Sequence, residues 1–167
     1  MRIFFHTGII FIVISLFSGC ARTNAFTRFD FSKVKERATS SLRTSKINRG
    51  DQIYGVFSSV YLNEVIPEKY NGMEYFYITI YTKDGAKLFD PNLLDKRKMT
   101  LRLNGKLPVK IKKLESGGKF EGLIPLNNNW NSYYLVAFDE DDSEKLSLTL
   151  QSGYFYSQPL IYRKGEQ

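Results

Sequence analysis

The sequence is short of the residues that most often carry catalysis and covalent cross-links. Its 167 residues include one cysteine, Cys20, and one histidine, His6. A single cysteine leaves no disulfide within the chain. Because both residues lie within the first 20 positions, the rest of the chain offers no Ser–His or Cys–His pair and little material for a transition-metal site. We therefore expect a protein that is not an enzyme and that uses no cofactor.

Other catalytic signatures are also scarce. Ser116, Gly117 and Gly118 are typical of a turn, whereas a phosphate-binding loop needs glycines between a strand and a helix. Residues 50–167 hold 15 acidic side chains, but no spacing among them singles out a pair for glycoside hydrolysis.

No hydrophobic run is long enough for a comfortable membrane-spanning helix. The apolar stretch at residues 9–17 is much shorter than the roughly 20 residues that a span needs. One basic residue, Arg2, precedes this stretch, and the small residues Ser18 and Gly19 follow it. This arrangement is typical of an export signal.

The end of this stretch, Leu16-Phe17-Ser18-Gly19-Cys20, resembles the lipobox of bacterial lipoproteins, with Phe17 where that family prefers Leu. The resemblance implies that Cys20 becomes the first residue of the mature chain and carries acyl chains such as palmitate. It also implies sorting to the outer membrane, facing the periplasm, in a Gram-negative host, because Ala21 rather than Asp follows the cysteine. The alternatives are a signal peptide cut near Gly19 or Ala21, and an uncleaved anchor.

Charge divides the chain after the signal into two parts. Residues 20–49 hold eight basic and two acidic side chains, whereas residues 50–167 hold 15 of each. We therefore predict three segments: a lipoprotein signal peptide (1–19), a basic tether (20–49) and a β-domain (50–167). The tether either attracts an anionic bilayer or serves as a solvated spacer. Asp30 or Ser32 is a candidate N-cap for a short helix through about Arg43, whose thin apolar face needs a packing partner.

Residues beyond Gln52 follow strand patterns. In residues 75–81, Phe76, Ile78 and Ile80 alternate with tyrosines and a threonine. Seven such segments predict an all-β fold, an antiparallel β-sandwich of immunoglobulin-like architecture, with a small β-barrel as the alternative. The predicted strands are 53–65, 75–81, 99–103, 107–114, 132–138, 145–150 and 158–163, with a further short strand proposed at 120–124.

A dense basic region surrounds Asn104-Gly105, which is the strongest hairpin signal in the chain. If 99–103 and 107–114 pair as that hairpin, Arg102, Lys110 and Lys112 share one face. Such a face would attract anionic lipid, cell-wall carboxylates or an acidic partner; alternatively, the lysines protect an exposed edge from aggregation. The candidate basic surface comprises Lys96, Arg97, Lys98, Arg102, Lys106, Lys110, Lys112 and Lys113.

Acidic and aromatic residues suggest further surfaces. Asp139, Asp141 and Asp142 are a weak Ca²⁺ candidate, because they lack the spacing of a dedicated calcium loop; a solvated hairpin tip is the favoured reading. Trp130, in an Asn-rich loop, is expected to cover one end of the domain. The tyrosines of 75–81 and the aromatic run 154–156 are interpreted mainly as core, or else as a binding surface for a glycan or protein.

Together these features predict a lipid-anchored cell-envelope lipoprotein that binds or scaffolds another envelope component. Its expected partners are the membrane, through lipid on Cys20, and a protein or cell-wall component, with no nucleic acid. The alternative is a ligand-binding or enzymatic module that acts on cell-wall glycan or lipid.

Overall fold

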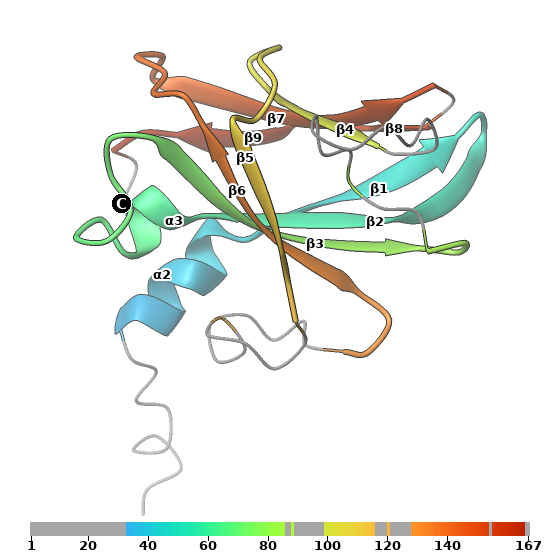
Figure 1. The fold of residues 1–167 in the computed structure, drawn as a ribbon, viewed down its shortest axis with the longest axis horizontal. Coiled ribbons are helices and arrows are strands. Elements are labelled where there is room, and N and C mark those ends of the chain that lie inside the picture. The colour runs from blue at the N-terminus through green and yellow to red at the C-terminus, as the bar shows by residue number, and fades with distance from the viewer. Residues whose placement is uncertain are drawn as a thin grey trace, which may run out of the picture. The chain divides into compact units, whose positions relative to one another are not determined.

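The computed structural model describes residues 33–85, 88, 99–115, 120, 128–153 and 155–165. Two helices and nine strands occur within these residues (Figure 1). The helices are α2 (Lys33–Ser41) and α3 (Leu62–Val65). The strands are β1 (Arg43–Arg49), β2 (Gln52–Tyr61), β3 (Glu74–Thr82), β4 (Thr100–Leu103), β5 (Lys110–Leu114), β6 (Ser132–Phe138), β7 (Lys145–Ser152), β8 (Phe155–Ser157) and β9 (Leu160–Arg163).

All nine described strands belong to one sheet that curls into a half-barrel. Its order is β4-β7-β8-β1-β2-β3-β6-β5, with β9 also paired to β7, and the paired strands are antiparallel. The predicted all-β class is confirmed. The two separate sheets of a sandwich are not formed, because β8 pairs with both β7 and β1 and makes the hydrogen bonding continuous.

The start of the sheet lies earlier in the chain than the sequence pattern indicated. β1 occupies the end of the segment interpreted as a tether, and it pairs with β2 on one side and β8 on the other. Its sequence, RTSKINR, has a single apolar residue, Ile47, which is fully buried. The predicted strand 53–65 also ends early, because residues 62–65 form α3.

The Asn104-Gly105 turn is present, but it does not join a long hairpin. Both residues have positive φ values, 48° and 84°, which suits a tight two-residue turn. Pairing stops after the Leu103–Lys106 bridge. β4 then pairs with β7 and β5 with β6, so two strands that are neighbours in sequence lie at opposite ends of the sheet order.

The inner face of the curled sheet encloses the larger core. Leu146, Leu148 and Leu150, which the sequence pattern predicted to point inward, are fully buried. Phe76, Ile78 and Ile80 of β3 join the same cluster, as the alternation predicted. Aliphatic and aromatic side chains from β1 to β4, β6, β7 and β9 fill this inner space.

A second cluster lies on the outer face under the two helices. Ala38 of α2 and Leu62 and Val65 of α3 pack with Val60 and Tyr77, which point outward from β2 and β3. The apolar face predicted for the first helix therefore has a packing partner, and Val34 and Leu42 are partly buried there. Within the described residues, neither helix is long and apolar enough to cross a bilayer.

Candidate functional site

Four of the predicted site residues lie outside the described residues. They are Cys20 at the proposed acylation site and Lys96, Arg97 and Lys98 of the candidate basic surface. The acylation of Cys20 therefore stays a prediction.

The other five basic residues do not share one face. Arg102 is half-buried on β4 and donates to the Gly105 carbonyl at 2.8 Å. Lys106 lies in the turn and pairs with Asp141. The prediction that Arg102, Lys110 and Lys112 share one face is wrong. It assumed that β4 and β5 pair with each other, whereas β4 pairs with β7 and β5 pairs with β6.

On β5, two lysines remain together on the outer face. Lys112 is opposite Leu135, which packs against the outer cluster, and Lys110 is opposite Ala137. Lys113 is opposite Tyr134 of the inner cluster and so belongs to the other face. Lys110 and Lys112 are both exposed, and we call this pair the β5 basic face.

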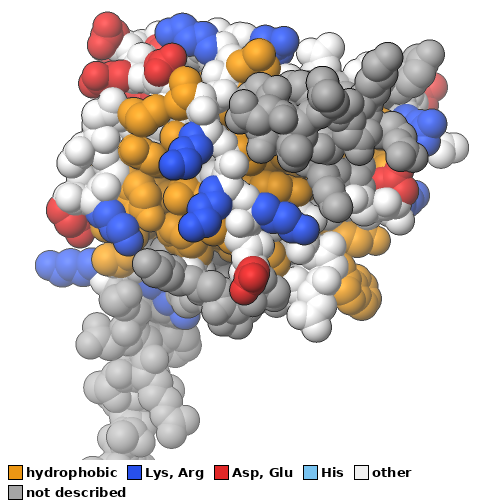
Figure 2. All heavy atoms as spheres, viewed as in Figure 1, with side chains coloured by type: hydrophobic (Ala, Val, Ile, Leu, Met, Phe, Trp, Pro, Cys, Tyr) orange, Lys and Arg blue, Asp and Glu red, His pale blue; other side chains and the backbone are white. Residues whose placement is uncertain are grey.

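Partly exposed apolar side chains lie near the β5 basic face. On β3, which pairs with the other side of β6, Tyr75 is opposite Ala137 and is only partly buried. Leu107 and Val109, just before β5, are 43% and 47% exposed. Figure 2 shows Lys and Arg side chains standing among hydrophobic ones on the face where Figure 1 draws β5 and β6 in front. A surface that combines positive charge with apolar area can bind an acidic partner that also offers apolar contacts.

The acidic loop after β6 is not a uniformly solvated tip. Asp139 and Asp142 are exposed, but Asp141 is buried. Its carboxylate accepts from the Ser143 N–H at 3.0 Å and from Lys106 Nζ at 3.1 Å. Hydrogen bonds from the side chain and backbone of Ser143, followed by the Lys106 contact, hold the pKa of Asp141 well below its usual range. Asp141 is thus committed to internal contacts, which leaves the three-residue Ca²⁺ candidate without structural support.

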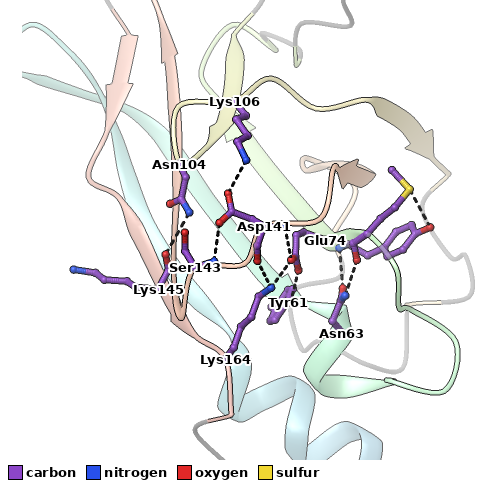
Figure 3. A network of polar contacts seen from close by, with 11 residues as sticks. Tyr61, Asn63, Glu74, Asn104, Lys106, Asp141, Ser143, Lys145 and Lys164 are labelled. Carbon is purple, nitrogen blue, oxygen red and sulfur yellow. Dashed lines mark hydrogen bonds and ion pairs between the residues drawn. The ribbon is translucent and has the colours of Figure 1, made fainter.

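Behind this loop lies a buried polar network centred on Glu74 (Figure 3), whose side chain is 2% exposed. One carboxylate oxygen accepts from Lys164 Nζ at 2.6 Å and from the Asp141 N–H at 3.1 Å. The other oxygen accepts from the Tyr61 hydroxyl. Lys164 Nζ also donates to the Asp141 carbonyl.

The network joins four parts of the chain that are distant in sequence. Tyr61 ends β2, Glu74 begins β3, Asp141 follows β6 and Lys164 follows β9. Burial, followed by the hydrogen bond to Glu74, raises the pKa of Tyr61, which therefore keeps its proton and acts as a donor. The Glu74 carboxylate is thus an acceptor with three donors around it, an arrangement suited to holding segments together.

Asparagine side chains form further hydrogen bonds between separate segments. Asn63 of α3 donates to the Met73 carbonyl at 2.6 Å and accepts from the Tyr75 N–H at 2.8 Å. Asn104 accepts from the Ser147 N–H at 2.9 Å, which fastens the turn to β7. The sequence patterns missed the network because the partners of Glu74 lie 13 to 90 positions away from it and no local periodicity marks them.

Trp130 does not cover an end of the domain, contrary to the sequence-based expectation. Its side chain is 79% exposed. The surrounding loop is nevertheless well fixed, because Asn128 Oδ1 accepts from the Trp130 and Asn131 N–H groups at 3.0 and 2.9 Å.

The described residues contain no group of three or more His, Cys, Asp or Glu side chains arranged to hold a metal ion. Comparison with known proteins found no match to the chain among protein-family models, curated proteins or solved structures.

Proposed function

We propose that the chain is a lipid-anchored cell-envelope lipoprotein whose β-domain binds or scaffolds an acidic envelope component. The observation that carries the anchoring is the sequence Leu16–Cys20 at the end of a short apolar run behind Arg2. Acyl chains on Cys20 would make membrane attachment effectively permanent, since each buried CH₂ contributes about 0.8 kcal/mol.

The β5 basic face supports the binding role. Lys110 and Lys112 stand on the outer face with partly buried apolar neighbours, at the end of the sheet order where β5 has one strand partner, β6. A tethered domain meets its partner at high effective concentration, so contacts of modest strength suffice. No observation on the described residues favours the alternative of an enzyme or ligand-binding module acting on cell-wall glycan or lipid, since side chains fill the inner space of the sheet.

Anchoring is tested with Cys20→Ser in the full chain. We expect the wild type in the membrane fraction, with acyl chains on Cys20 by mass spectrometry, and the variant released into the soluble fraction if it is processed. Wild-type protein that is soluble and unacylated would overturn the anchoring.

Binding is tested by placing a photo-cross-linker at Leu135, beside the β5 basic face, in acylated protein in its own membranes. Reversing charge with Lys110→Glu and Lys112→Glu should reduce cross-linked product at least several-fold, and added salt should do the same in the wild type. Lys113→Glu, on the opposite face of the same strand, is the matched control. Equal loss with the control, or no cross-linked product from the wild type, would contradict the binding role of this face.

A further inference from the structure

The outer face of β2 and β3 carries three successive cross-strand pairs. These are Val60–Tyr77, Ser58–Thr79 and Val56–Tyr81. Residues two apart along a strand point to the same face, so all three pairs lie on the face that holds α2 and α3. Val60 and Val56 are four residues apart, about 14 Å along the strand.

The two ends of this row differ in what covers them. At the first end, Val60 and Tyr77 are 1% and 6% exposed beneath the helices. At the far end, Val56 and Tyr81 are 39% and 37% exposed. Figure 1 shows the same arrangement: α2 and α3 lie at one end of β2 and β3, and no helix of the described residues lies over the opposite end.

More exposed apolar side chains adjoin the uncovered pair. Ile53 is 48% exposed and lies opposite Asn48 of β1, while Tyr156 of β8 is 42% exposed and lies opposite Asn48 on its other side. The exposed Lys46 is opposite Val56. We call Ile53, Val56, Tyr81 and Tyr156 the bare patch.

The two strands beneath the bare patch approach each other closely. Gly55 precedes Val56, and a Cβ at this position would lie 2.0 Å from the Tyr81 carbonyl oxygen. Glycine therefore permits the close approach of β2 to β3 at this point.

The turn that carries Trp130 lies at the same end of the sheet as Tyr81. Ser132 pairs with Ile80, so the turn that carries Trp130 adjoins the end of β3 where Tyr81 lies. Tyr133, whose ring belongs to the outer cluster, donates its hydroxyl to the Asn128 carbonyl at 2.7 Å. This bond holds the start of the turn, at Asn128, on the outer side of the sheet.

The proposed lipid attachment precedes α2, which packs on the outer face. Only the 12 residues from 21 to 32 separate Cys20 from the first residue of α2. Twelve extended residues span at most about 40 Å. Basic side chains at the start of α2, Lys33, Lys35 and Arg37, outnumber the single acid Glu36, so this face is suited to an anionic bilayer surface.

We propose that the bare patch and Trp130 seat the β-domain on the lipid bilayer that holds its acyl chains. Tryptophan and tyrosine prefer the membrane–water interface, because their rings are apolar and their N–H and O–H groups remain hydrated. Exposed Val and Ile add apolar area, and Lys46 offers a positive charge to lipid phosphates. This inference rests on the proposed lipid anchor, which keeps the patch within a short tether of the membrane.

The single tryptophan of the chain makes the inference directly measurable. Acylated full-length protein is reconstituted into vesicles of phosphatidylcholine and phosphatidylglycerol, with or without bromine on the phosphatidylcholine acyl chains. Seating predicts blue-shifted emission from Trp130 and at least twofold quenching by the brominated lipid. Emission that is unquenched and as accessible to acrylamide as in detergent would overturn the proposal.

Two variants locate the contact. Tyr81→Ser should reduce the quenching by at least half, whereas Leu107→Ser, at an exposed apolar residue before β5, should leave it unchanged. Circular dichroism confirms that each variant keeps its sheet. A blue shift without quenching that grows with the protein-to-lipid ratio would identify a second copy of the chain as the occupant and contradict the proposal.

Mass spectrometry on the same vesicles distinguishes a failure of the membrane seating from a failure of the lipid anchoring. If Cys20 carries acyl chains and Trp130 stays unquenched, the seating fails while the anchoring stands. If Cys20 is unmodified, the anchoring itself fails.

Discussion

The covered and uncovered ends of the β2–β3 pair present similar side chains in different surroundings. Val60 with Tyr77 and Val56 with Tyr81 are the same two residue types, paired across the same strands on the same face. The first pair lies under helices and the second is open to solvent. Strand alternation thus identifies a face, but what covers that face is decided by elements elsewhere in the chain.

The covered end also holds the Glu74 network, and its loss should have the largest effect. Lys164→Met leaves a carboxylate of 2% exposure without its cation, which should lower the free energy of unfolding by about 3 kcal/mol or more. Chemical denaturation measures the loss. Adding Glu74→Gln should recover part of it, because a neutral amide needs no counter-charge.

Lys145→Met, at an exposed lysine on β7, is the control and should change stability little. If Lys164→Met were as mild as this control, the network would not stabilise the covered end.

Matched tyrosine substitutions test the comparison itself. Tyr77→Ala removes a ring that stacks with Phe120 and Tyr133, at centroid distances of 4.9 and 6.2 Å, and should cost about 3 kcal/mol. Tyr81→Ala should cost about 1 kcal/mol or less, since it loses mainly its cross-strand contact with Val56. Equal losses in thermal or denaturant unfolding would show that the uncovered end is packed as firmly as the other.

The smallest effect concerns Asp141, which fastens the acidic loop next to the network. Its pKa is lower in the folded state than in the unfolded state, so the folded protein binds fewer protons in the acid range. The stabilisation from Asp141 is therefore complete above the unfolded pKa of about 3.9 and is lost as the pH falls below it.

Lys106→Met should flatten this acid loss by a small amount, because the lysine side chain is 60% exposed and such pairs contribute about 1 kcal/mol or less. Most of the acid loss should remain in this variant, because the hydrogen bonds from Ser143 are the largest cause of the lowered pKa of Asp141. Unfolding free energies at pH 3 and pH 7 provide the measurement, and a steeper acid loss in the variant would contradict the assignment.

Regular alternation made part of the fold predictable. Leu146, Leu148 and Leu150 repeat at every second position, and β6 coincides with the predicted 132–138. β1 lacked this signal, because Ile47 is its one apolar residue. Its place in the sheet is instead set by hydrogen bonds to strands on both sides. Asn104-Gly105 specified a turn but not the strand partners, since β5 takes its register from β6, as in Ile111–Val136.

The candidate sites were less predictable than the strands. Lysines that cluster in the sequence do not all lie on one face. Lys112 and Lys113 are adjacent on β5 and therefore point to opposite faces. Trp130 is 79% exposed, and its backbone N–H donates to Asn128 Oδ1, a contact that composition does not encode. Glu74 acquired its partners only through folding.

The central place of β1 has a consequence for the order of folding. Its partner β2 follows within a few residues, but its other neighbour, β8, is 110 positions later, as in the pair Ile47–Ser157. During synthesis from the N-terminus, one edge of β1 therefore stays unpaired until the last strands arrive. Such long-range closure is slow, and an open edge is prone to aggregation meanwhile. Six of the seven residues of β1 are charged or polar, a composition that disfavours edge-to-edge aggregation.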